Sequence, residues 1–258
     1  MGILLLKLVA TPLLILVASL AGRRWGESVS GWFVGLPLTS GPVVFFLALE
    51  EGSGFAAGAA TGCLAGAAAE AGFCIGYANI ARHTGWPLAL AAGTIGFVAA
   101  AFLLGMAALA LPPLAALVAL ALAGALRLMP WHGTAVLTLP AAPRWDIPAR
   151  MIVATALVFG LTELAPLFGA QLSGMAATYP VFAAVLAAFA HHARGAAAAT
   201  GVLRGLLVGL FGFIGFFAVL ASTIEAIGIA AAFVAATALA FAIQGATFSA
   251  LRRKGLRR

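Results

Sequence analysis

The sequence is built from long apolar runs separated by short polar clusters, and each run has the length of one membrane-spanning helix. A bilayer core of about 30 Å requires roughly 20 apolar residues per helix. The polar clusters divide the chain into runs over 2–20, 30–49, 54–79, 86–104, 107–126, 149–168, 172–190, 196–221 and 226–247. This pattern predicts an all-α, polytopic membrane helix bundle with about nine transmembrane helices.

The composition favours a membrane rather than water as the surroundings of these helices. Only 8% of the 258 residues are charged and 64% are hydrophobic, whereas a soluble domain carries about 25% charged residues. The net charge of +7 comes from basic residues placed singly or in pairs between apolar runs, without one basic patch rich in aromatic residues. We therefore expect membrane lipids as partners and no nucleic acid.

The uncharged run over 86–126 is too long for one helix. Its 41 residues would extend roughly 60 Å at about 1.5 Å per residue. We expect a helical hairpin that turns near Gly105. Pro112 and Pro113 would then lie early in the second helix, where a missing amide is tolerated.

The basic residues fall on alternate loops. Those after the first, third, fifth, seventh and ninth spans are Arg23, Arg24, Arg82, Arg127, Arg144, Arg150, Arg194, Arg252, Arg253, Lys254, Arg257 and Arg258. The loops after the second and eighth spans carry only Glu50, Glu51 and Glu225. Because cytoplasmic loops collect Lys and Arg, we expect the N-terminus outside and the C-terminus in the cytoplasm.

Two parts of the sequence resemble each other. Ser, Gly and Pro stand at 30, 31 and 37 and again at 173, 174 and 180, and Ala-Ala-Thr-Gly follows at 59–62 and at 198–201. This pattern predicts two four-helix repeats over 1–105 and 149–258, joined by a linking helix and cytoplasmic loop over 106–148. With one span between them, the repeats would be inverted, as in many alternating-access carriers. The alternative is chance similarity between Ala- and Gly-rich helices.

A family resemblance rests on the same segments. Gly-Leu-Pro, a second proline, a Phe-rich stretch and a polar break over 35–52, with Ser-Gly through Tyr-Pro-Val-Phe to His-His over 173–192, resemble the small four-helix GlpM-type bacterial membrane proteins, as if two were fused. The resemblance implies a duplication and a bacterial cytoplasmic (inner) membrane. The family has no settled activity, so it implies no catalytic residue.

Glycines form stripes on the two central helices, at 54, 58, 62 and 66 and at 201, 205 and 209. Such stripes let another backbone approach closely. Packing within the chain is the plain interpretation. The stripes would equally suit a homodimer or a partner membrane protein.

Glu70 is the most informative single residue. It continues the first stripe inside its span, where a carboxylate is costly unless it is paired or hydrated. Tyr77 follows on the same face, so both side chains are predicted to line one polar crevice. Arg204 lies at comparable depth in the eighth span, which leaves two interpretations: a structural Glu70–Arg204 ion pair, or a site for protons or substrate.

Prolines interrupt the second span and its counterpart. Pro37 and Pro42 flank Thr39 and Ser40 near mid-span, and the break frees backbone groups that need a partner. The interpretations are a simple kink and a discontinuous, ligand-contacting helix.

The counterpart of this break in the seventh span is Tyr179-Pro180. Glu163 in the sixth span is a second candidate acid for the same solute or ion pathway, beside Pro166, which would loosen the helix.

Motifs for catalysis, metal binding or nucleotide binding are absent from the sequence, so we expect no enzyme, no metal and no cofactor. The first hypothesis is a secondary transporter that moves a small or amphipathic, lipid-like solute by alternating access, driven by an ion gradient. The alternatives are a non-transporting accessory subunit and a flippase for a lipid or lipid-linked intermediate.

Overall fold

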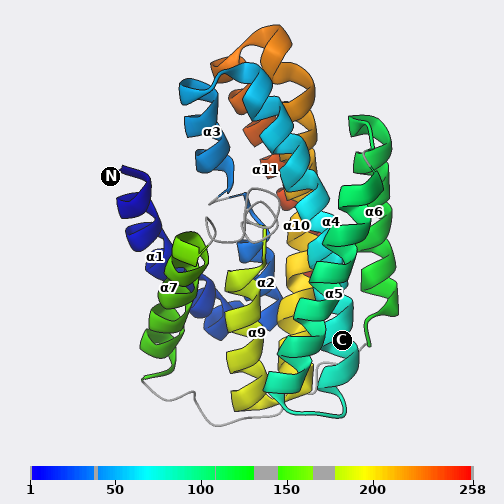
Figure 1. Ribbon diagram of the computed structural model, residues 1–258. Coiled ribbons are helices and arrows are strands. Elements are labelled where there is room, and N and C mark those ends of the chain that lie inside the picture. The colour runs from blue at the N-terminus through cyan, green and yellow to red at the C-terminus, as the bar shows by residue number, and fades with distance from the viewer. Residues whose placement is uncertain (1, 38–39, 108, 131–144, 165–177, 257–258) are drawn as a thin grey trace.

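The described part of the chain is entirely helical, as predicted (Figure 1). The computed structural model describes residues 2–37, 40–107, 109–130, 145–164 and 178–256, and no strand occurs within these ranges. The helices are α1 (Gly2–Trp25), α2 (Glu27–Val34), α3 (Ser40–Glu50), α4 (Ser53–Ala81), α5 (Trp86–Ala107), α6 (Leu111–Leu128), α7 (Asp146–Leu164), α9 (Val181–Arg194), α10 (Ala196–Ile227) and α11 (Ile229–Leu256).

Within the described ranges, five helices are long and apolar enough to cross a membrane. They are α4, α5, α6, α10 and the Ile229–Ser249 part of α11, and they match the predicted third, fourth, fifth, eighth and ninth spans. The predicted second span is divided into α2 and α3, and α3 and α9 are shorter apolar helices. The length and composition of these helices fit a multi-pass membrane protein.

The hairpin over 86–126 is confirmed, but its turn lies later than expected. Helix α5 continues through Gly105 to Ala107, and α6 begins at Leu111. Pro112 and Pro113 occupy the first turn of α6, where no intrahelical partner for their missing amides is lost. The two prolines therefore determine where α6 begins, whereas Gly105 does not end α5.

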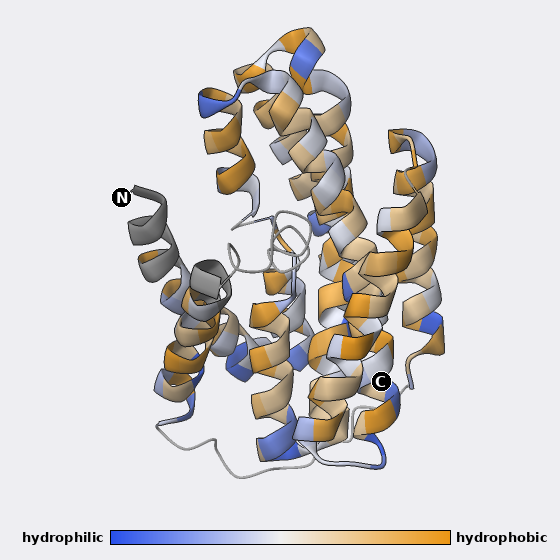
Figure 2. Ribbon diagram, in the orientation of Figure 1, coloured by the Kyte–Doolittle hydropathy of each residue, from blue (hydrophilic) through white to orange (hydrophobic). Residues whose placement is uncertain are grey.

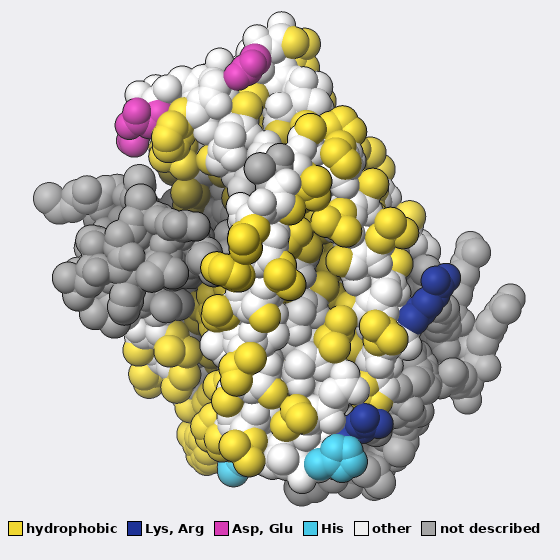
Figure 3. Space-filling model, turned by 45° about the vertical axis from the view of Figure 1, so that its right-hand side comes forward, with side chains coloured by type: hydrophobic (Ala, Val, Ile, Leu, Met, Phe, Trp, Pro, Cys, Tyr) yellow, Lys and Arg dark blue, Asp and Glu magenta, His cyan; other side chains and the backbone are white. Residues whose placement is uncertain are grey.

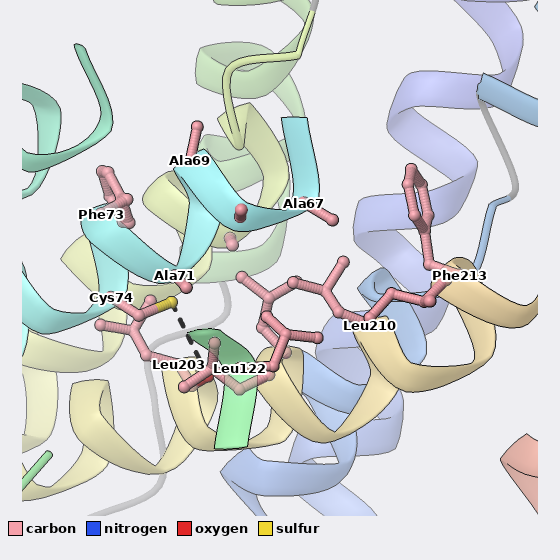
Figure 4. Packing of buried hydrophobic residues seen from close by; sticks show 14 of the residues in the cluster. Ala67, Ala69, Ala71, Phe73, Cys74, Leu122, Leu203, Leu210 and Phe213 are labelled. Atoms are coloured by element: carbon pink, nitrogen blue, oxygen red, sulfur yellow. Dashed lines mark hydrogen bonds between the residues drawn. The ribbon is translucent and has the colours of Figure 1, made fainter. Parts of the chain in front are cut away.

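Helices α4 and α10 pack together at the centre of the bundle, and most of the buried side chains belong to them. Figure 4 shows this contact, where the Sγ of Cys74 approaches the carbonyl of Leu203 at 3.9 Å. The peripheral helices expose large apolar side chains, among them Leu88, Ile95, Phe102, Leu103, Met106, Leu120, Val234 and Phe241. Such a surface suits contact with lipid.

The two ends of the bundle differ in charge. Figure 1 shows the helices running alternately toward one end and then the other, except that α2 and α3 run in the same direction, and Figure 2 shows apolar residues along their length. Figure 3 shows acidic side chains at one end, and basic and histidine side chains toward the other. We call these the acidic end, which holds Glu50, Glu51 and Glu225, and the basic end, where α4 and α9 finish.

Two similar turns connect a short helix to a central helix. Gly52 joins α3 to α4 with φ +91°, and Gly195 joins α9 to α10 with φ +83°. Residues with a Cβ rarely adopt this left-handed backbone conformation, which glycine adopts without strain. The turns are therefore short and fixed by their glycines.

Helix α2 lies backbone to backbone against α10. A Cβ at Gly35 would be 2.8 Å from the Cα of Gly209, and a Cβ at Gly205 would be 2.6 Å from the carbonyl carbon of Ser28. Gly31 is equally close to the backbone of α10, at Val202. Part of the predicted glycine stripe of α10 is therefore an internal packing face, as its plain interpretation proposed.

Gln244 forms a polar link between α10 and α11. Its Nε2 donates to the carbonyl of Gly209 at 2.8 Å, and its side chain is buried. We expect Gln244→Leu to lower the free energy of unfolding by about 1 kcal/mol, because interhelical hydrogen bonds within membranes contribute about that much. Thermal unfolding midpoints in one detergent would measure this loss, with Ala238→Leu at an exposed position of α11 as control. Equal midpoints for the two variants would contradict it.

Candidate functional site

The candidate site lies where the middle of α4 meets the start of α9. A Cβ at Gly66 would be 2.7 Å from the Cβ of Thr178, so α4 touches the residues that precede α9. Two helical turns further along α4, the Phe73 ring meets the Tyr179 ring edge to face, with centroids 5.9 Å apart. The predicted break at Tyr179-Pro180 is thus packed directly on the glycine stripe of α4.

Glu70 lies on α4 between these two contacts. Its side chain is half-buried, about three turns before the end of the helix, and no hydrogen bond or ion pair joins it to any described residue. Cys74, one turn later on the same face, faces α10 through the Leu203 carbonyl. Glu70 therefore lies on α4 between its contacts with the α9 break and with α10, and its carboxyl group has no partner among the described residues.

Arg204 does not pair with Glu70, so the expected structural ion pair is not formed. Its guanidinium instead donates to two carbonyl oxygens at the end of α6, Leu126 at 2.9 Å and Met129 at 3.2 Å. A cation there is favoured because the last carbonyls of a helix lack intrahelical partners. Arg204 fastens α6 to α10 and leaves Glu70 without its predicted counter-charge.

Tyr77 is fully buried, and its hydrogen-bond partner was not among the site residues predicted from the sequence. Its hydroxyl lies 3.2 Å from the Nδ1 of His191, near the end of α9. The hydroxyl of Tyr77 is thus engaged by α9, and the polar crevice expected along Glu70 and Tyr77 stays a prediction. The signal for this contact in the sequence is weak, because the two residues are 114 positions apart.

Tyr179 ties the start of α9 to α5. Its hydroxyl lies 2.8 Å from the Oγ1 of Thr94, and its ring packs against Phe97 with centroids 5.4 Å apart. Pro180 is buried immediately before α9. This break is therefore anchored by aromatic and polar contacts within the chain.

The break in the second predicted span is a true discontinuity. Helix α2 ends at Val34 and α3 begins at Ser40, while the amide of Gly41 donates to the carbonyl of Pro37 at 3.0 Å. Ser40 and Pro42 are half-buried in the first turn of α3. Thr39 lies outside the described residues, as does the side chain of Glu163 near the end of α7.

An ion network at the basic end was not predicted. Asp146 bridges Arg23 and Arg150 at 3.3 and 3.1 Å, and Arg194 pairs with Glu27. Sequence reasoning had counted the three arginines as loop charges. The spacing of Asp146 and Arg150 by one helical turn is the only local signal for any of these pairs.

A comparison of this chain with protein-family models, with curated proteins and with solved structures finds no match.

Proposed function

We propose that this protein is a secondary transporter that moves a small or amphipathic solute by alternating access. Glu70, which has no partner among the described residues, carries the proposal, because an acid inside a membrane span is costly and usually marks a solute, ion or proton pathway. Its position beside an interrupted helix is the second support, since broken helices form the binding sites of many carriers. A carboxyl group that binds and releases one proton would couple transport to a proton gradient.

The proposed architecture is nine spans, with two inverted four-helix repeats joined by α6. In this scheme α1 corresponds to α7, and α2 with α3 corresponds to the segment that ends in α9. Helices α4 and α5 correspond to α10 and α11. The alternating direction of the helices in Figure 1 supports this scheme. So do the turns at Gly52 and Gly195, which are 143 positions apart and share one backbone conformation.

Contacts between helices recur with the same separation of 143 positions. The contact of Gly35 with Gly209 corresponds to that of Thr178 with Gly66. On the outer side of α4, Gly72 packs on Gly96, and the corresponding contact joins positions 215 and 239. Related contacts at a constant separation are expected of two copies of one unit packed about a pseudo-two-fold axis.

The separation of 143 corrects one detail of the sequence comparison. The Ala-Ala-Thr-Gly segments at 59–62 and 198–201 are 139 positions apart, four short of the register set by the contacts. In the register of 143, glycines 58, 62 and 66 correspond to glycines 201, 205 and 209. The proposal keeps the duplication and its resemblance to GlpM-type proteins, with this corrected alignment.

The proposed orientation places the basic end in the cytoplasm of a bacterial cell and the acidic end outside the cytoplasmic membrane. Its support is the bias of Lys and Arg toward cytoplasmic loops and the separation of charge between the two ends (Figure 3).

Transport is tested in liposomes that contain equal amounts of folded protein. Proton flux and the uptake of a solute panel are measured at several pH values for the wild type, Glu70→Gln and Glu70→Asp. We expect Glu70→Gln to reduce flux at least tenfold, because an amide cannot exchange a proton, and Glu70→Asp to retain part of it. Glu225→Gln, at an exposed acid of the acidic end, is the matched control. Flux in Glu70→Gln equal to that of the wild type would rule out the proposed role.

One observation favours an accessory subunit as the second candidate function. Gly54, Gly58 and Gly62 are exposed on α4, and a Cβ at Gly58 or Gly62 would meet nothing within 4 Å. An open small-residue stripe suits a partner helix. A wild type that carries no solute in any liposome assay, yet co-purifies with one membrane protein that Gly58→Leu releases, would establish this alternative.

A further inference from the structure

The ion network at the basic end consists of two sets of ion pairs, one centred on Asp146 and the other between Arg194 and Glu27, and the two sets together involve four helices. It links the end of α1 (Arg23), the start of α2 (Glu27), the start of α7 (Asp146 and Arg150) and the end of α9 (Arg194). The side chains of Asp146 and Arg150 are 5% and 4% exposed, which excludes an ordinary surface salt bridge. Removing Asp146 would leave the buried guanidinium of Arg150 without its ion-pair partner.

Two further contacts join helices at the basic end. The guanidinium of Arg150 lies over the ring of Phe189 on α9, 5.4 Å from its centroid. The hydrogen bond between Tyr77 and His191 adds α4 to these helices. Tyr77 and the ion network therefore both lie between the level of Glu70 on α4 and the basic end.

The sequence does not repeat this network at the acidic end. At the separation of 143, the positions that correspond to Asp146, Arg150 and Arg194 hold isoleucine, lysine and glutamate at 3, 7 and 51. The central acid of the network is thus missing there. Helix α9 packs against α7, whereas its counterpart α3 has no comparable contact with α1 among the described residues.

We propose that the ion network is the gate of the basic end, closed in this structure, and that access to Glu70 from that end requires the network to separate. This inference rests on the proposed function. Alternating access needs two ends that close in turn, and an end held by ion pairs opens when those pairs exchange their partners for water. The Nε atoms of Arg150 and Arg194 are buried without a hydrogen bond, so the closed network is incompletely satisfied and the energetic cost of opening it is reduced.

Thiol labelling tests the gate without measuring transport. The reporter is Ala187→Cys on α9, buried one turn from His191 toward the break, in a chain with Cys63→Ala and Cys74→Ala. A membrane-impermeant maleimide is applied from the side of the basic end in vesicles of known orientation. We expect slow labelling with the intact network and at least tenfold faster labelling with Asp146→Asn. The exchange of charges in Glu27→Arg with Arg194→Glu should keep labelling slow, and Glu225→Gln should leave it unchanged.

A second reporter separates gating from unfolding. Native Cys63, half-buried in the half of α4 nearer the acidic end, is labelled from that end in a Cys74→Ala chain. Opening of the gate should slow its labelling, because the two ends open alternately. Faster labelling of both reporters, or an unchanged rate at Ala187→Cys in Asp146→Asn, would overturn the gate. Absence of flux in the wild type would count against the proposed function and leave these labelling results to stand on their own.

Discussion

Gly205→Leu is expected to disrupt the fold, with a loss of more than about 3 kcal/mol in the free energy of unfolding. Gly205 lies on α10 against the backbone of α2, and a Cβ there would be 2.6 Å from the carbonyl carbon of Ser28. A flexible side chain moves away from an inserted group at a cost of about 1–3 kcal/mol. The backbone of a helix cannot move aside locally in this way. A leucine at position 205 would therefore displace the whole of α2 and the break that follows it.

Gly62→Leu is the matched control for this prediction. Gly62 is 143 positions earlier on α4, exposed, with nothing within 4 Å of a Cβ, and leucine there would face lipid. The yield of monodisperse protein in detergent and its thermal midpoint measure both variants. A Gly205→Leu protein as stable as Gly62→Leu would show that α2 does not pack on α10 as described.

Glu70→Leu is expected to stabilise the protein by about 2 kcal/mol while it removes proton flux. Glu70 has no hydrogen-bond or ion-pair partner among the described residues and lies well inside α4, so its polar group costs about 1–3 kcal/mol. Leucine has a similar size and avoids that cost. Substitutions of residues that serve activity at the expense of stability commonly raise stability and lower activity together.

Asp146→Leu provides the contrast, because the same chemical change removes a paired acid. It leaves Arg23 and Arg150 without their shared carboxylate, and we expect a loss of about 3–5 kcal/mol. Thermal unfolding of both variants in one detergent measures whether each substitution raises or lowers the stability of the protein. Destabilisation by Glu70→Leu comparable to that by Asp146→Leu would assign Glu70 a structural role.

The helical class and the positions of most helices were predictable because they depend on local sequence. Apolar runs near 20 residues set the helices, and polar clusters or prolines set their ends. Pro37 marked the discontinuity between α2 and α3, although the sequence left a simple kink as an alternative. The glycine stripe of α10 correctly indicated a close helix contact, without identifying α2 as the partner.

The partners of the charged residues were not predictable, because they depend on contacts between distant segments. Arg204 is at a depth that suits Glu70, yet the carbonyls at the end of α6 are nearer. Asp146 binds an arginine 123 positions earlier, and no local pattern carries that information. A charge in a loop and a charge in a buried network look alike in one sequence.

The short turns at Gly52 and Gly195 determine how α3 and α9 are able to move. Because only one or two residues separate each short helix from its central helix, a movement of either short helix would be a swing about its glycine and not a slide along the bundle. Helix α3 has 11 residues, so it is about 16 Å long. A swing of about 10° at Gly52 would carry its far end, next to the Pro37 break, through about 3 Å. In such a swing the end of α3 beside the discontinuity would move most, and the turn at Gly52 would move least.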